Sequence, residues 1–303
     1  MSVYGAVAVV LGAVLDGLFA EPPASHHPVA WLGRTVSPLD RDWGSPALAG
    51  GTVAVFVPLA AAVPVAVLVD AVAVFASPWL AAVLAGVVVF VTTSRRMLVD
   101  LASDVIEASD GDLATARDAL LGLAGRDASE LSAGQVRSAA VESAAENLAD
   151  GLVAPLLAFT AGAAFGLPVA AGAAVWVKAV NTLDSMLGYE SKPHGTASAR
   201  LDDLVMWIPA RVSALLLAIA AGAPRSLTRA REWANEPPSP NSGWPMATVA
   251  AVLDARLEKP GVYVLHPTAE LPDTAAAQRG VDVVSRAGWL AYTGAVLGVV
   301  AWP

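Results

Sequence analysis

Three carboxylates recur at intervals of four residues in the segment VESAAENLADG, residues 141–151. On a helix, Glu142, Glu146 and Asp150 would form one acidic stripe, with the amide of Asn147 beside it. Like charges on one stripe repel by a few tenths of a kcal/mol per pair, so the stripe suits Mg²⁺, a basic substrate or an arginine cluster. A solvated acidic face is the alternative, which is weakened because an apolar run follows directly and charge is costly there.

A second polar segment, KAVNTLDSMLGY, covers residues 178–189. Helical spacing puts Lys178, Asn181 and Ser185 on one face, with Asp184 beside them. Lys178 ends an uncharged run of 26 residues. Its ammonium therefore either extends to the membrane interface or points inward at an anion.

The segment ASARLDDLVMWIPAR, residues 197–211, continues this pattern. Arg200, Asp203, Trp207 and Arg211 follow a nearly helical stripe, and Asp202 is adjacent. Arg211 lies inside the next apolar run, where a charged side chain needs a partner and is a candidate functional group. Asp203 is two turns away, so we expect that partner on another helix or on a bound phosphate.

Two further segments are rich in Pro and polar residues. EPPASHHPV (21–29) precedes Arg34, and its His26 and His27 could bind a metal or a phosphate. A rigid interfacial loop is the alternative there. SPNSGWPM (239–246) contains Asn241 and Trp244, and from composition alone it is typical of a structural turn.

The composition indicates the elements that must position these groups. Of 303 residues, 56% are hydrophobic and 15% charged, against about a quarter charged in soluble domains. The net charge of −9 argues against nucleic-acid binding, and the absence of Cys excludes disulfides and thiolate chemistry. We expect an all-α, polytopic membrane bundle from about six apolar runs, residues 3–20, 47–69, 71–93, 152–177, 208–223 and 287–302.

The expected organisation is a single integral membrane domain over residues 1–303. It would carry a polar helical insert at about 94–150 and a Pro-rich loop region at about 224–286. If 152–177 were one straight helix, its ends would lie about 40 Å apart and the polar segments on its two sides could not share a site. Gly166 and Pro168 permit a re-entrant hairpin instead. We therefore expect all the polar segments to converge on one cavity.

The segments, in this order, resemble the CbiB/CobD family, the adenosylcobinamide-phosphate synthases of cobalamin biosynthesis. The resemblance rests on DGLFAEPP, HPV and LGR near the N-terminus, ESAAENLADGLVAP (142–155), KAVNTLDSMLGY, ASARLDDL, IPAR and SPNSGWPM. These pieces extend over about 80% of the chain. Two departures are Glu21 in a position where the family usually has Asp, and a shorter loop at 190–196.

The resemblance implies a multi-pass enzyme of the cell membrane that forms an amide. It would join a carboxylate of adenosylcobyric acid to aminopropanol or its phosphate, with ATP and Mg²⁺, although no familiar nucleotide motif is present. The corrinoid, the amine and the lipid bilayer are the expected partners. The alternatives are a transporter, which charged intramembrane residues would suit but for which no inverted repeat is found, and a non-catalytic membrane sensor.

This chemistry suggests roles for the polar residues. Carboxylates would hold the metal or act as a base, and cations would bind phosphates. The candidate catalytic residues are Glu142, Glu146, Asn147, Asp150, Asp184, Asp202 and Asp203. The candidate metal ligands are Glu146, Asp150 and Asp203. The candidate substrate- or phosphate-binding residues are His27, Arg34, Lys178, Asn181, Ser185, Arg200, Arg211, Asn241 and Trp244.

Overall fold

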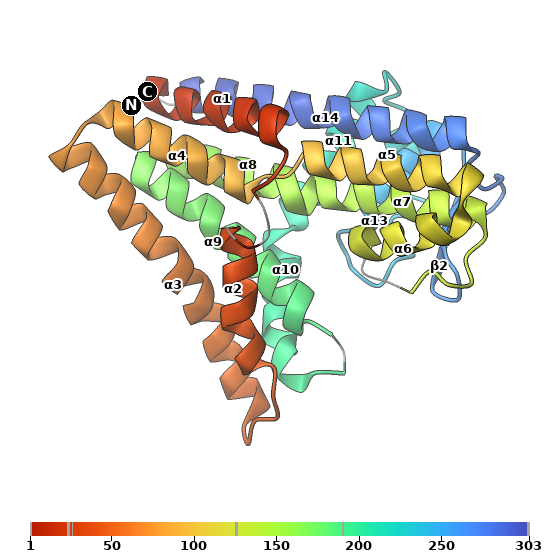
Figure 1. The fold of residues 1–303 in the computed structure, drawn as a ribbon, viewed down its shortest axis with the longest axis horizontal. Coiled ribbons are helices and arrows are strands. Elements are labelled where there is room, and N and C mark those ends of the chain that lie inside the picture. Colours follow the sequence, from red (N-terminus) through yellow and green to blue (C-terminus); the bar gives the residue numbers. More distant parts are fainter. Residues whose placement is uncertain (1, 23–24, 26, 125–126, 190, 302–303) are drawn as a thin grey trace. The chain divides into compact units, whose positions relative to one another are not determined.

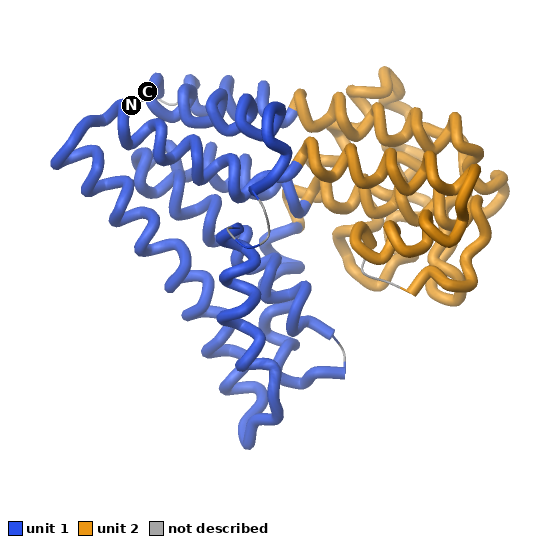
Figure 2. Tube along the Cα trace, in the orientation of Figure 1, with its two compact units in different colours: residues 1–94, 150–206, 291–303 blue, residues 95–149, 207–290 orange. Residues whose placement is uncertain are grey.

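Helices dominate the fold in Figure 1, which shows a computed structural model. The structure describes residues 2–22, 25, 27–124, 127–189 and 191–301, and His26 of the predicted histidine pair lies outside them. The predicted all-α class is confirmed, since one short hairpin is the only β structure in the described chain. The chain forms two compact units, coloured in Figure 2. Unit 1 comprises Met1–Ser94, Asp150–Met206 and Ala291–Pro303, and unit 2 comprises Arg95–Ala149 and Trp207–Leu290.

Unit 1 is organised around one helix, α9 (Leu167–Leu187). Five helices pack against α9, and all of them belong to unit 1. They are α2 (Pro28–Val36), α3 (Pro46–Phe75), α4 (Pro78–Thr92), α8 (Ala154–Ala163) and α10 (Thr196–Val205). Helix α1 (Ser2–Phe19) packs mainly on α4, and the unit also contains the short 3₁₀ turns η1 (Ser37–Leu39) and η3 (Pro193–Gly195) and the end of the chain from Ala291.

The apolar run 152–177 folds as a hairpin of α8 and α9. Gly166, at φ 121°, occupies a backbone conformation that only glycine adopts readily, and it separates the two helices. A Cβ on Gly162 would meet the Ala170 backbone at 2.8 Å, so the pair packs closely. Ten residues make α8 about 15 Å long, half of a hydrocarbon core. The reading of 152–177 as one straight span is therefore wrong, and the hairpin alternative is confirmed.

The membrane-protein character is confirmed by four helices that are long and apolar enough to cross a bilayer. They are Ser2–Phe19, Pro46–Phe75, Pro78–Gly111 and Thr274–Ala301. The pair Pro193–Val205 and Trp207–Ala220 raises the number to five if it is counted as one bent span. The sequence predicted about six; when the bent pair is counted, the missing one is the run 152–177, which forms a hairpin.

Unit 2 combines helices from the polar insert with the segment after residue 206. The expected insert at 94–150 is helical, and it forms α5 (Arg96–Gly111), α6 (Leu113–Ala124) and α7 (Ala133–Leu148). The remainder comprises α11 (Trp207–Ala220), α12 (Ser226–Ala230), α13 (Gly243–Leu253), β1 (Leu257–Lys259), β2 (Tyr263–Leu265) and the first half of α14 (Thr274–Ala301). Helix α13 packs on α7, α11 and α12, and the antiparallel hairpin β1–β2 packs on α7 and α13.

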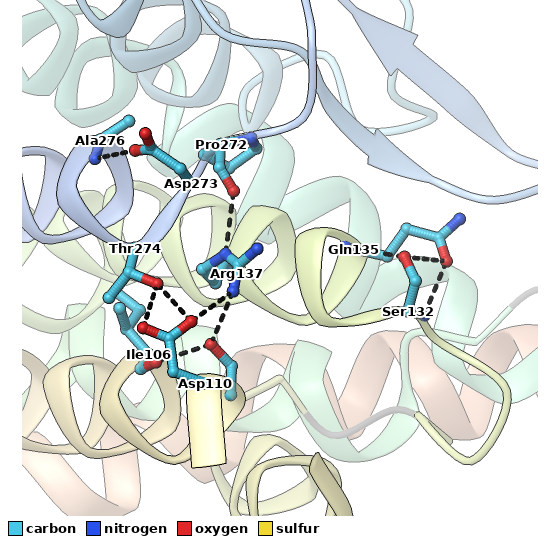
Figure 3. A network of polar contacts seen from close by, with 10 residues as sticks. Ile106, Asp110, Ser132, Gln135, Arg137, Pro272, Asp273, Thr274 and Ala276 are labelled. Atoms are coloured by element: carbon cyan, nitrogen blue, oxygen red, sulfur yellow. Dashed lines mark hydrogen bonds and ion pairs between the residues drawn. The ribbon is translucent and has the colours of Figure 1, made fainter. Parts of the chain in front are cut away.

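Polar contacts anchor the helices of the insert to the start of α14 (Figure 3). The Arg137 guanidinium on α7 donates to Asp110 Oδ1 at 3.1 Å and to the Pro272 carbonyl at 2.9 Å. The Thr274 hydroxyl donates to the same Asp110 carboxylate at 2.6 Å. The N-terminus of α7 is closed by a capping box, in which Ser132 and Gln135 satisfy each other's backbone N–H groups. These bonds explain how so polar a segment folds as packed helices.

Candidate functional site

The polar face of α9 is the centre of a group of ionisable and other polar side chains in unit 1. We call this group the α9 cluster, and it comprises Glu21, His27, Asp150, Lys178, Asn181, Asp184, Asp202 and Asp203. Its members come from the α1–α2 loop, the turn before α8, α9 itself and α10. The structure thus brings together seven residues that the sequence predicted separately, and it adds Glu21.

Asp150 occupies a break in helical geometry. The chain between α7 and α8 forms a π-helical turn, η2 (Ala149–Val153), and π turns often occur at functional sites. The Gly151 carbonyl of this turn accepts a hydrogen bond from the Ser94 amide at 2.9 Å. The Asn181 amide donates to the Asp150 carboxylate, and Lys178 and Asp202 are near enough to interact with it electrostatically. Burial and the Asp202 charge raise the pKa of Asp150 to about 7.

Lys178 connects Asp150 to the N-terminal loop. Its ammonium interacts with the carboxylates of Glu21 and Asp150, which belong to different segments. Of the two sequence readings, an inward-pointing Lys178 is therefore the one that the structure supports. A partly buried cation between two carboxylates could hold an anionic substrate group if one carboxylate became protonated or moved away.

His27 is the N-cap of α2 and is 8% exposed. Its Nδ1 accepts from the Val29 amide at 3.2 Å, and its Nε2 lies 3.6 Å from the Glu21 carboxylate. Burial lowers the pKa of His27 more than the nearby Glu21 raises it. The imidazole is therefore neutral at pH 7, and its proton is on Nε2 because Nδ1 is an acceptor.

The acidic end of the cluster joins α9 to α10. Asp184 on α9 interacts electrostatically with Asp203 on α10. Two glycines allow the intervening chain to turn closely: a Cβ on Gly188 would collide with Asp184 Oδ1, and a Cβ on Gly195 with the Leu187 carbonyl oxygen. The close turn brings the carboxylates of Asp184 and Asp203 into the same group.

Three predicted residues of unit 1 are exposed rather than central to the cluster. Ser185 donates its hydroxyl to the Asn181 carbonyl at 2.9 Å, and Arg34 and Arg200 lie on exposed faces of α2 and α10. Within the described chain, Arg34 and Arg200 have no recorded ion pair. Their predicted binding roles remain predictions.

In unit 2, the predicted residues Arg211, Asn241 and Trp244 form one contact group. Arg211 Nη1 donates to Asn241 Oδ1 at 3.0 Å and to the Trp207 carbonyl at 2.8 Å. Its guanidinium lies over the rings of Trp207, at 4.3 Å, and Trp244, at 5.2 Å. The sequence placed this partner on another helix or on a bound phosphate, whereas in the structure it is Asn241, in the turn that precedes α13.

The other two carboxylates of the predicted acidic stripe lie on α7 in unit 2. Glu142 is 2% exposed and accepts hydrogen bonds from the hydroxyls of Ser138, at 2.7 Å, and Tyr263, at 2.5 Å. Glu146 and Asn147 are half-buried, and the Asn147 amide donates to the Ser143 carbonyl at 3.0 Å. Glu142 therefore has a packing role on the β hairpin in addition to any chemical role.

The metal prediction stays open. Among the described residues, no group of three or more His, Asp or Glu side chains has an arrangement that could hold a metal ion. The set Glu146, Asp150 and Asp203 thus remains a prediction. Mg²⁺ commonly uses one or two carboxylates together with substrate phosphates, so a site of this kind need not be complete in the protein alone.

Two carboxylates were not selected as site residues from the sequence. Glu21 belongs to the α9 cluster, and the signal was its place beside the Pro run. Asp16 is fully buried in α1 and is the only charged residue of that helix. A lone carboxylate in an apolar helix is a functional candidate by default, and this rule would have identified Asp16.

Comparisons with known proteins identify the family of this chain. A family model described as CobD/Cbib protein matches residues 9–290. The chain belongs to the CobD/CbiB family. It is 34% identical to a "Probable cobalamin biosynthesis protein CobD" from Methanothrix thermoacetophila, with 93% of each chain covered. It is 36% identical to the "Cobalamin biosynthesis protein CobD" of Rhodobacter capsulatus, and the match covers 91% of this chain and 89% of the relative. It is 38% identical to the protein of the same name from Klebsiella pneumoniae, with 82% of this chain and 81% of the relative covered. No solved structure matches the chain.

Proposed function

We propose that this protein is an enzyme of cobalamin biosynthesis that joins a carboxylate of adenosylcobyric acid to aminopropanol, or aminopropanol phosphate, through an amide bond. The observation that carries the proposal is the family match across residues 9–290. The α9 cluster supports it, because it places carboxylates, an amide and an ammonium at one location in a membrane protein.

The reaction defines what the site must do. A carboxylate is a poor acyl donor, so its oxygen would first attack the γ-phosphorus of ATP and release ADP. The amine nitrogen would then attack the acyl carbon, the C–N bond would form, and inorganic phosphate would leave. The attacking ammonium has to lose protons to a base, and a base is most effective when its pKa is near the working pH.

Asp150 has the properties of that base. With a pKa of about 7, it is deprotonated in about half of the molecules at neutral pH and can accept a proton. Asn181 holds the carboxylate by a hydrogen bond, and Lys178 provides a positive charge beside it. In this proposal Asp150 takes the proton, while Lys178 holds an anionic group of the substrates.

The oxygen donors of the cluster are chemically suited to Mg²⁺. Asp184, Asp202 and Asp203 offer hard carboxylate ligands near Asp150, and one or two of them would hold the ion together with the phosphates of ATP. The ion, when bound, would neutralise phosphate charge. Arg211, whose guanidinium lies over two indole rings and donates to Asn241, is the corresponding cation candidate in unit 2.

The test is product formation by the purified chain in detergent or nanodiscs. Adenosylcobyric acid, ATP and Mg²⁺ are incubated with aminopropanol or with its phosphate, and mass spectrometry detects the amide. We expect product with one of the two amines, and a loss of at least 100-fold in Asp150→Asn and Lys178→Met. The matched controls are Asp104→Asn and Lys259→Met, which change exposed residues of unit 2. Absence of product in all reactions would reject the proposed reaction, and uptake of corrinoid by vesicles would then favour a transporter.

A further inference from the structure

Unit 2 contains a cavity that none of the predicted site residues lines. Its volume is about 250 Å³, and it lies where the ends of α11 and α13 meet the first half of α14. One wall is apolar, with Val252, Leu253 and Val283 among its residues. The other wall is charged, and it is formed by three residues of α14: Arg279, Asp282 and Arg286.

The charged wall is suited to an anion. Arg279, Asp282 and Arg286 follow the spacing i, i+3, i+7, which places all three on one face of α14. The two arginines start about 10 Å apart along the helix axis, and Asp282 lies between them in the sequence. The three groups sum to one positive charge, and within the described chain no ion pair is recorded for either arginine. Both guanidiniums are exposed, so they can turn toward a ligand.

The position along α14 indicates the kind of anion. Residues 287–301, which follow Arg286 directly, contain no charge, and Thr274–Ala301 is one of the candidate spans. Trp289 comes one turn after Arg286 and is 45% exposed. The Arg95 guanidinium lies over its ring at 4.3 Å. Exposed Trp and Arg at the end of an apolar helix are typical of the membrane–water interface. The cavity therefore opens where lipid headgroups would be found.

We propose that this cavity binds the phosphodiester headgroup of an anionic phospholipid. Arg279 and Arg286 would bind the phosphate oxygens, for which the guanidinium fork is well suited. Val252, Leu253 and Val283 would contact the glycerol and the first methylenes of the acyl chains. Inorganic phosphate offers the same oxygen chemistry but nothing for the apolar wall.

The experiment measures which lipid the intact chain retains. The protein is purified from mixed micelles of phosphatidylcholine and phosphatidylglycerol at 4:1, and native mass spectrometry counts each lipid bound. We expect enrichment of phosphatidylglycerol over its share in the micelle. The double variant Arg279→Gln/Arg286→Gln should lower this enrichment at least fivefold, and Arg279→Lys/Arg286→Lys should restore part of it.

Two further variants separate the cavity from general surface charge. Val252→Trp, which leaves the charge unchanged, should fill the cavity and lower the enrichment as well. Arg225→Gln/Arg231→Gln removes two exposed arginines near α12 that do not line the cavity, and it should leave retention unchanged. A thermal unfolding curve confirms that each variant is folded.

Three results would overturn the proposal. Equal retention in wild type and in folded Arg279→Gln/Arg286→Gln would show that these arginines bind no lipid. Equal losses in the Arg225/Arg231 control would show that net charge alone is responsible. Loss of phosphatidylglycerol on adding millimolar inorganic phosphate, at constant ionic strength, would identify a free-phosphate site instead.

Discussion

The carboxylate of Glu142 offers a sharp test of how unit 2 is held together. It accepts from the hydroxyls of Ser138 on α7 and Tyr263 on β2, and Ser138 Oγ in turn accepts from the Glu258 amide on β1 at 2.8 Å. Strand β2 is thereby bonded to the buried carboxylate directly, and β1 is linked to it through Ser138. The substitution Tyr263→Phe removes the hydroxyl that donates to Glu142 and keeps the aromatic ring.

The expected cost follows from burial and charge. A hydrogen bond to a charged group contributes about 1.5–3 kcal/mol, about twice a neutral one. Glu142 is 2% exposed, so water cannot readily replace the lost hydroxyl. We therefore expect Tyr263→Phe to lower the free energy of unfolding by about 1.5–3 kcal/mol, a factor of about 10 to 150 in the ratio of folded to unfolded protein.

The assay is unfolding of the purified chain in mild detergent, followed by tryptophan fluorescence. Tyr189→Phe is the matched control, because Tyr189 is 58% exposed and its variant should stay within about 0.5 kcal/mol of wild type. A double-mutant cycle with Glu142→Gln measures the coupling directly. If the two single effects add to within about 0.3 kcal/mol, the hydroxyl is not bonded to a charged carboxylate and the reasoning fails.

Three other predictions follow from contacts within one unit. Arg211→Lys removes the guanidinium that bonds Asn241 and lies over two indoles, so thermal unfolding should show a loss of about 1–2 kcal/mol that Arg225→Lys does not show. Gly195→Ala would place a Cβ against the Leu187 carbonyl and should reduce the yield of folded protein sharply, whereas Gly44→Ala, with open space around Gly44, should not. Hydrogen bonds from His266 and Arg229 lower the pKa of Asp254 below its unfolded value, so this stabilisation is present above a pH of about 4 and is lost as the pH falls further. Asp254→Asn, which tolerates the left-handed backbone there, should be less stable than wild type at pH 7 and should approach it in acid; a constant difference across pH would contradict this.

Some of the structure could be predicted because its signal is local. Gly166 and Pro168 interrupt the apolar run 152–177, and the chain turns between α8 and α9 at that position. Arg211 inside an apolar run required a partner, and the turn residue Asn241 is that partner. Both signals, the helix break and the charge inside an apolar run, can be seen in the sequence without knowledge of the packing.

The contacts that escaped prediction join segments with no local signal. Tyr263 is 121 residues from Glu142, and nothing in the short strand β2 distinguishes its hydroxyl from that of any other tyrosine. Glu21 was visible as a departure from the family pattern, but its interaction with Lys178 depends on how the α1–α2 loop lies against α9. The position of a charged residue relative to the apolar runs therefore indicates that burying its charge costs free energy. Only the packing shows which oppositely charged side chain offsets that cost. For this reason the spacing of the acidic stripe could be read from the sequence, while the division of its carboxylates between hairpin packing, at Glu142, and the α9 cluster, at Asp150, required the fold.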